Sequence, residues 1–320
     1  MNEDYLWDRS GEPEPEVARL EQLLGQLRWS ERALKRAKSA PPWRQRRWWT
    51  LTAAAAIVLC FGTAFFVQRM RLLQPMTSWE LSLADQKPSG VRAGQVIDTV
   101  GVSRATMQSN LVGKVDIEPN SRVRLIAAHE HEQRLALDHG TIHAFIWAPP
   151  AQFVVDTPSA KTVDLGCKYT LSVATNGEGF LTVEMGWVAF QWSNLESFIP
   201  AGAACTTRPG HGPDTPHFLD APEALAKGVA DFDLTGRTQA LNLALSAARP
   251  RDALTLWHLL QRTQGVERAE VFDHFQTLVK LPSSLTREGV LSGDRKSMNA
   301  AWDALDLGDI SWWRGWERQW

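Results

Sequence analysis

The stretch "KTVDLGCKYTLSVATNGEGFLTVEMGWVAF", residues Lys161 to Phe190, decides the fold class of this chain. Apolar residues alternate with polar ones on both sides of "NGEG" (Asn176 to Gly179), whose composition favours a tight turn. The alternating apolar residues are Val163, Leu165, Cys167, Tyr169, Leu171 and Val173 before the turn, and Leu181, Val183, Met185 and Trp187 after it. A period of two is that of a strand with one buried face, so the pattern predicts a strand, a turn and a second strand.

Similar short runs surround this hairpin, from about Trp79 to Cys205. They include "GKVDIEP", "SRVRLIAA", "QRLALDHG", "TIHAFIWA" and "QFVVDTP". Turn residues separate the runs at intervals of about ten, which is typical of an all-β sandwich, roll or barrel. We therefore expect residues 79–205 to form a β domain and the chain to be mainly β.

Four blocks of this region together resemble a FecR-type domain. They are "VDIEPNSRVRLI" (Val115 to Ile126), "LALDHGTIHAFI" (Leu135 to Ile146), "FVVDTPSAKTVDLGCKYTLSV" (Phe153 to Val173) and "LTVEMGWVAF" (Leu181 to Phe190). The order and spacing of the blocks carry the resemblance, which covers about 125 residues. It implies a periplasmic β domain of a transmembrane regulator whose partner is an extracytoplasmic-function sigma factor.

The chain departs from that family in two ways. About 47 residues precede the apolar segment, whereas the family commonly has a larger helical cytoplasmic domain. A further hundred or so residues follow the β domain, and the resemblance does not extend to them. The His-x-x-x-Cys-x-x-Cys zinc motif of the other common anti-sigma class is also missing from the sequence.

The segment "WWTLTAAAAIVLCFGTAFFV", Trp48 to Val67, predicts one transmembrane helix. Its 20 residues carry no charge, and at about 1.5 Å per residue they match a hydrocarbon core of about 30 Å. Eight basic residues and one acid lie between Arg28 and Arg47, against three basic residues between Gln68 and Lys87. The positive-inside rule then places residues 1–47 in the cytoplasm and the bulk of the chain in the periplasm, in contact with the inner-membrane bilayer.

An amphipathic helix is expected in the cytoplasmic segment. Val17, Leu20, Leu24 and Leu27 fall on one helical stripe after the proline-rich "SGEPEPE". One helix cannot bury its own stripe, so we interpret these four residues as a candidate partner-binding surface.

Helical spacing returns near the C-terminus. Residues 206–235 are interpreted as a loop or linker, and residues 236–320 as a small helical region. The spacing puts Leu254, Trp257 and Leu260 on one face, and Met298, Trp302 and Leu305 suggest another helix. The tail "WWRGWERQW" is either aromatic core or a docking surface, and core is the reading that aromatic stripes favour.

The sequence contains little evidence for a catalytic site. His129, His131, His139 and His143 gather in "AAHEHEQRLALDHGTIHAF", but the cupin-like glutamate that would complete a metal site is missing, and we expect strand and turn residues without a metal or cofactor. No nucleophile elbow, phosphate loop or zinc-protease motif occurs, so no enzymatic activity is expected. The net charge of −2 gives no reason to expect direct nucleic-acid binding.

Cysteine usage leaves one question open. Cys167 and Cys205 can form a disulfide if their region lies outside the cytoplasm, but their spacing alone does not show that they meet.

The sequence thus favours a single-pass signalling protein that relays the state of the envelope, through a ligand or an outer-membrane protein, to a cytoplasmic sigma factor or similar regulator. The alternative is a membrane-anchored module that binds or supports envelope components without cytoplasmic signalling.

Overall fold

The computed structural model describes residues 15–25 and 79–307 of the chain, except 84–86, 100, 102–103 and 194. The chain divides into an N-terminal unit, Met1–Leu72, and a second unit, Leu73–Trp320, here called the body. In the N-terminal unit the described element is helix α2, Pro15–Gly25. The expected membrane helix (48–67) and the tryptophan-rich tail lie outside the described residues. Among the described helices, none combines the length and the apolar character that a membrane span requires.

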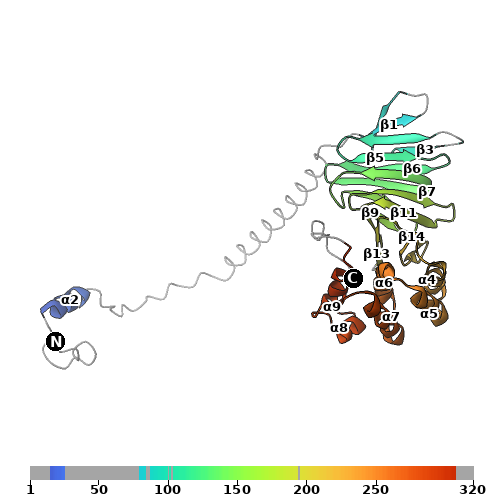
Figure 1. The fold of residues 1–320 in the computed structure, drawn as a ribbon. Coiled ribbons are helices and arrows are strands. Elements are labelled where there is room, and N and C mark those ends of the chain that lie inside the picture. Colours follow the sequence, from blue (N-terminus) through green and yellow to red (C-terminus); the bar gives the residue numbers. More distant parts are fainter. Residues whose placement is uncertain are drawn as a thin grey trace, which may run out of the picture. The chain divides into compact units, whose positions relative to one another are not determined.

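The body is built mostly on antiparallel strands, confirming a mainly β chain with helices after the strands (Figure 1). The strands are β1 (Trp79–Leu83), β2 (Ser89–Val91), β3 (Val96–Asp98), β4 (Ala105–Ser109), β5 (Gly113–Ile117), β6 (Arg122–His129), β7 (Glu132–Ile146), β8 (Phe153–Asp156), β9 (Lys161–Asp164), β10 (Lys168–Val173), β11 (Gly179–Met185), β12 (Trp187–Trp192), β13 (Leu195–Pro200), β14 (Ala203–Arg208), β15 (Gly212–Pro213) and β16 (His217–Phe218).

The strands form two sheets that share one strand. The first sheet runs β3-β6-β7-β8-β9-β12-β13, with β7 and β8 parallel. The second runs β2-β1-β4-β5-β7-β10-β11-β14, and both β15 and β16 pair with β14. The first part of β7 belongs to the first sheet and its second part to the second sheet, so β7 links them.

Gly140 lies where β7 passes from one sheet to the other. Its φ is +101°, and an added Cβ would lie 2.3 Å from the Cα of Ser121. Only glycine fits this conformation and this close approach, so the sequence "DHGT" places the bend.

The hairpin that decides the fold also crosses between the sheets. The first arm is β9 in one sheet and β10 in the other, and the second arm is β11 and β12. Both arms cross at a glycine with positive φ, Gly166 and Gly186, and an added Cβ on Gly186 would lie 2.1 Å from the Gly166 carbonyl oxygen.

The expected buried face is confirmed for the first arm, whose alternating residues from Val163 to Val173 are all buried. The second arm is buried as expected at Leu181 and Val183, but the prediction is wrong for Met185, whose side chain is exposed. The continuous strand expected there is interrupted because the crossing at Gly186 ends one strand and starts another.

Helices follow the strands and gather at one end of them (Figure 1). They are α4 (Glu223–Thr235), α5 (Thr238–Ala247), the short 3₁₀ helix η1 (Pro250–Asp252), α6 (Ala253–Arg262), α7 (Gly265–Leu278), α8 (Arg287–Ser292) and α9 (Arg295–Asp303). The interpretation of 206–235 as a linker is wrong, because this segment contains β15, β16 and α4. The apolar residues Leu225, Val229 and Phe232 of α4 are buried in the core of the body.

Helix α6 lies against the edge of the first sheet. The backbone N–H of Phe198 in β13 donates a hydrogen bond of 3.0 Å to Nε2 of His258, and Nδ1 of His258 donates to the Leu254 carbonyl at 2.9 Å. Burial lowers the pKa of His258 to about 3, so the ring is neutral and can accept this bond. The edge N–H that a neighbouring strand would otherwise satisfy is therefore paired by a helix side chain.

A cluster of aromatic rings seals the same junction. The ring of Trp302 lies 4.6 Å from that of Trp257, 5.3 Å from that of Phe198 and 5.8 Å from that of Trp187. These residues come from two strands and two helices, and one continuous core contains buried residues of both the sheets and the helices. The sheets and the helices are accordingly one folded body.

Candidate functional site

The predicted partner-binding stripe is described for three of its four residues. Val17, Leu20 and Leu24 lie on α2, and Leu27 falls outside the described residues. Leu20 and Leu24 are 57% and 58% exposed, and Leu23 beside them is 60% exposed. Three exposed leucines on one short helix form an apolar surface that binding to another surface would bury.

The histidine-rich stretch covers the end of β6, the turn of the β6–β7 hairpin and most of β7. His129 ends β6, His131 lies in the turn, and His139 and His143 lie in β7. His143 contacts the hydroxyl of Thr170 at 2.8 Å and the Glu118 carboxylate at 3.1 Å. Within the described ranges, no three His, Cys, Asp or Glu side chains are grouped to hold a metal ion.

The two cysteines predicted as a possible disulfide are both free thiols and are buried. They lie in different strands, Cys167 just before β10 and Cys205 in β14, and β11 lies between these strands. Burial raises the pKa of both thiols, so neither resembles an activated nucleophile.

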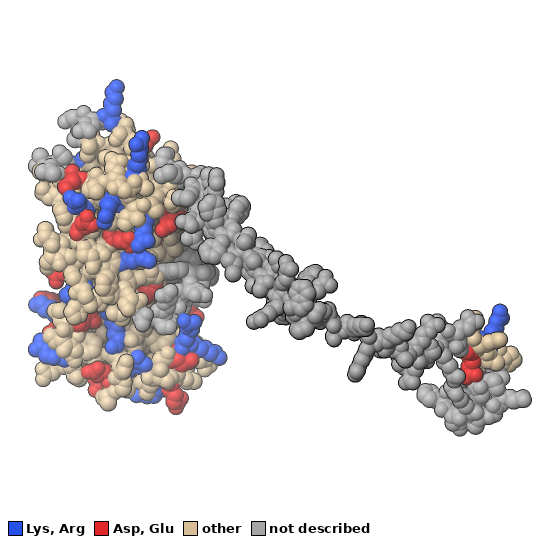
Figure 2. Space-filling model, turned by 180° about the vertical axis from the view of Figure 1, so that it is seen from behind, with Lys and Arg blue, Asp and Glu red and all other residues tan. Residues whose placement is uncertain are grey.

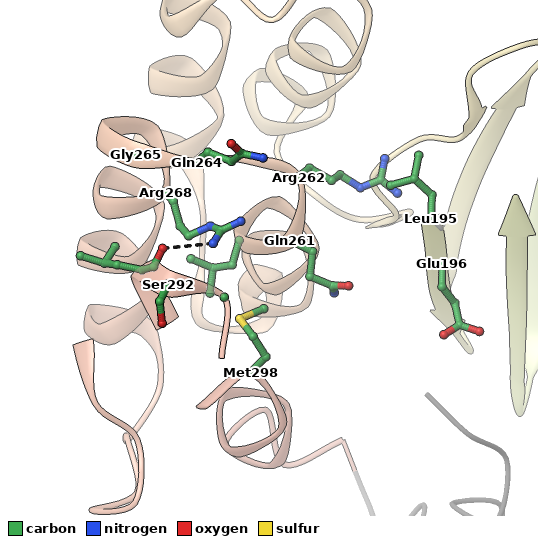
Figure 3. A pocket seen from close by; sticks show the side chains of 12 residues that line it. Leu195, Glu196, Gln261, Arg262, Gln264, Gly265, Arg268, Ser292 and Met298 are labelled. Carbon is green, nitrogen blue, oxygen red and sulfur yellow. Dashed lines mark hydrogen bonds between the residues drawn. The ribbon is translucent and has the colours of Figure 1, made fainter. Parts of the chain in front are cut away.

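A pocket of about 580 Å³ opens where the sheet edge meets the helices (Figure 3). Strand β13 supplies one wall through Leu195 and Glu196. The end of α6 and the start of α7 supply the next wall, and α8 and α9 close the pocket. This volume is within the range of small-molecule sites in proteins.

Arg268 of α7 provides a positive charge in the pocket wall. Its Nε donates to the Thr263 carbonyl at 2.7 Å and its Nη1 to the Leu291 carbonyl at 3.1 Å. Burial lowers the pKa of Arg268, and no carboxylate among the described residues forms an ion pair with it. Because a guanidinium has five N–H donors, three remain for a ligand or for water.

Two further polar side chains line the pocket. Glu196 is only 6% exposed, and its Oε1 accepts a hydrogen bond of 3.0 Å from Gln191. The side-chain nitrogen Nε2 of Gln261 is buried and has no hydrogen-bond partner among the residues that the structure describes. In Figure 3 Arg268 and Glu196 enter from opposite sides, with Gln261 and Met298 between them.

A buried network of charges holds this part of the body together. Arg262 of α6 donates to the carbonyls of Pro213 and Asp214 at 2.8 and 3.1 Å, and it lies 3.9 Å from Asp233 of α4. Asp214 pairs with Arg208 at 2.5 Å, and burial, with the nearby charge of Asp233, raises the pKa of Asp214 to about 6. The network ties β14 and β15 to α4 and α6, so it fixes one wall of the pocket.

Sequence reasoning did not find this pocket. Its residues come from five separate elements between Leu195 and Met298, and none of them belongs to a local motif. The relevant pattern in the sequence is the helical spacing of Leu254, Trp257 and Leu260. This spacing predicts the helix α6, but it does not predict the contact of α6 with β13.

The described charged residues on the face shown in Figure 2 do not gather into a second candidate site. Lys and Arg side chains are interspersed with Asp and Glu over the face of the body shown in Figure 2. The described residues on that face form no basic patch of the kind that binds nucleic acid.

No protein-family model matches the chain, and no curated protein matches it. Two of the solved structures that are similar to this chain are each described as a "putative anti-sigma factor" from Parabacteroides distasonis. The first has a TM-score of 0.33 and 12% identity, and the match covers 37% of this chain and 57% of that one. The second has a TM-score of 0.28 and 13% identity, with 41% and 57% covered. The chain thus spans little more than half of either neighbour, and FecR membership remains a resemblance.

Proposed function

We propose that this chain is a single-pass inner-membrane regulator that carries a signal from a periplasmic body to a cytoplasmic partner, which we expect to be a sigma factor. In this proposal the segment 48–67 spans the membrane, residues 1–47 face the cytoplasm, and the body lies in the periplasm. The protein acts by binding rather than by catalysis.

The observation that carries the proposal is the exposed leucine surface of α2. Leu20, Leu23 and Leu24 lie in a unit separate from the body, and more than half of each side chain is exposed. Burying an apolar side chain of this size stabilises a complex by about 1.5–3 kcal/mol. The basic residues between Arg28 and Arg47 and the apolar segment after them support the proposed location of this surface, at the cytoplasmic face of a membrane.

The decisive experiment is a membrane two-hybrid assay of the full-length chain against the sigma factors encoded in the same genome. Leu20→Asp should abolish the interaction because it puts a charge at the centre of the stripe. Gln22→Asp adds the same charge on the polar side of the same helix and should leave the interaction unchanged. The proposal fails if no sigma factor interacts or if the two variants behave alike.

Transcription gives an independent measurement. Deleting residues 1–40 should change the transcripts of the partner's regulon. Unchanged transcripts would instead support the membrane-anchored envelope module without cytoplasmic signalling.

A further inference from the structure

Large apolar side chains are exposed together at one end of the second sheet of the body. They are Leu111, Phe145, Trp147 and Met185, here called the end patch. Apolar side chains that are exposed singly need no explanation, whereas a group of them marks a surface that binds another apolar surface.

The turn between β4 and β5 holds the first part of the end patch together. Leu111 lies in this turn, and the indole N–H of Trp147 donates to the carbonyl of Asn110 in the same turn at 3.0 Å. The rings of Phe145 and Trp147 lie 5.6 Å apart. Because the indole N–H is already paired within the body, the ring can leave water without leaving a donor unsatisfied.

A row of side chains across four neighbouring strands continues the end patch. Opposite one another in this row are Lys114 in β5, Phe145 in β7, Lys168 in β10 and Met185 in β11. Lys114 pairs with Asp116 at 2.8 Å, and Lys168 pairs with Glu184 at 2.6 Å. The charges beside the end patch are therefore balanced within the body, so they do not select a strongly acidic or basic partner.

Polar side chains further along the same strands are paired with each other. His143 of β7 contacts the hydroxyl of Thr170 at 2.8 Å, and the hydroxyls of Thr141 and Ser172 lie 2.9 Å apart. A sugar ligand would need free donors and acceptors beside the aromatic rings. The pairing of these groups favours an apolar partner over a sugar.

The chain enters the body at the end of the sheet that carries the end patch. Strand β1 begins at Trp79, and its second residue, Glu80, lies opposite Gln108, beside the β4–β5 turn. In the sequence, eleven residues (68–78) separate Trp79 from the apolar segment 48–67. A chain of this length spans at most roughly 40 Å when fully extended. If the segment 48–67 crosses a membrane, the surface of that membrane is within reach of the end patch.

We propose that the end patch lies on the periplasmic surface of the membrane that anchors the chain, with Leu111 and Trp147 among the lipid headgroups. Tryptophan is enriched at this level of a bilayer because its ring is amphipathic. Burial of apolar area drives the contact, and the paired lysines make it largely independent of anionic lipid. The inference rests on the proposed function for the membrane segment, and it adds the surface through which the body contacts the lipid.

The test measures quenching of a fluorescent label by doxyl lipids, with the full-length chain in phosphatidylcholine nanodiscs. An NBD label is attached through Leu111→Cys or, for comparison, through Val266→Cys, because both native side chains are 75% exposed. Cys60→Ala removes the thiol of the apolar segment, and Cys167 and Cys205 are buried. Quenching should be at least about threefold stronger in the β4–β5 turn than on α7, since an interfacial apolar surface lies about 5–10 Å into the headgroup boundary.

A matched pair of substitutions tests the end patch itself. Phe145→Asp puts a charge at its centre and should lower the quenching in the β4–β5 turn to the level found on α7. The folded sheet can accept this carboxylate, because Lys114 and Lys168 lie opposite it on the two neighbouring strands. Phe180→Asp is the control and should leave the quenching unchanged. Phe180 is 45% exposed, against 42% for Phe145, and it lies opposite Ser172, away from the end patch. Thermal unfolding of both variants checks that each one is folded.

Equal quenching at the two label positions overturns the proposal, and so does quenching that Phe145→Asp leaves unaltered. A label in the β4–β5 turn that is shielded from water but not quenched by lipid shows that a protein, such as a second copy of the chain, covers the end patch, and this also overturns the proposal. The sigma-factor assay separates the two proposals. Quenching without a sigma-factor interaction leaves the lipid contact standing and refutes the regulator, and an interaction without quenching does the reverse.

Discussion

Replacing Asp164 by asparagine should remove much of the pH dependence of the body's stability. Asp164 ends β9 and is 1% exposed. Its carboxylate accepts the backbone N–H of Gly166 at 2.7 Å and a hydrogen bond from the thiol of Cys167. Burial raises the pKa of Asp164 from 3.8 to about 7, because the loss of solvation of the charged form outweighs the stabilisation by these hydrogen bonds.

The direction of the effect follows from this raised pKa. The folded state holds the Asp164 proton more tightly than the unfolded state, so the contribution to stability is full below the unfolded pKa. It is lost as the pH rises through the folded pKa. Between pH 5 and pH 8 these two pKa values correspond to a loss of about 3 kcal/mol in the free energy of unfolding.

The assay is urea unfolding of residues 73–320 at pH 5 and pH 8, followed by tryptophan fluorescence. The wild type should lose about 3 kcal/mol more than Asp164→Asn over this range, since asparagine cannot ionise. Other titrating groups, including Asp214, are present in both proteins and cancel in the difference. Asp138→Asn, at an exposed position, is the control and should follow the wild type. Equal pH dependence in the wild type and Asp164→Asn would refute the reasoning.

Three other predictions concern packing and reactivity. Trp302→Ala should lower the free energy of unfolding by about 3–5 kcal/mol, because it removes one ring from the cluster at the sheet–helix junction and leaves a cavity there. A urea midpoint close to that of the wild type would contradict this. Gly140→Ala should lower the free energy of unfolding by about 3 kcal/mol or more, whereas Gly94→Ala should lower it by about 1 kcal/mol. Both glycines have positive φ, but only Gly140 has neighbouring atoms where an added Cβ would lie. Thermal unfolding measures the loss of stability in each alanine variant. Equal losses in the two variants would show that crowding around Gly140 does not contribute. Cys167 and Cys205 should resist iodoacetamide in the native protein and react after denaturation, because both thiols are buried and burial raises the pKa of each; peptide mass mapping would expose rapid native alkylation or a disulfide between them.

The sequence predicted local features of the body well, because periodicity reports burial. The alternation from Val163 to Val173 identified a buried face, and the spacing of Leu254, Trp257 and Leu260 identified a buried helix face. Both patterns are set by residues that are neighbours along one element.

Features that depend on distant residues could not be predicted in this way. In the first arm of the hairpin the apolar alternation continues across the crossing between the sheets, so period two alone does not distinguish one strand from two. Strands β15 and β16 have two residues each and contain or adjoin proline and glycine, which favoured the linker interpretation. The pocket needs contacts between Leu195 and Met298, and one sequence contains no record of such proximity.

The hydrogen bond between β13 and α6 determines how this chain can be divided into fragments. A fragment that stops after the strands would retain the first sheet but lose His258, which pairs the Phe198 N–H. It would also expose Phe198, which is now buried against Trp257 and Trp302. An uncovered edge with aromatic side chains is a template for association between copies. Crystallisation trials and immunogens should therefore keep strands and helices in one polypeptide.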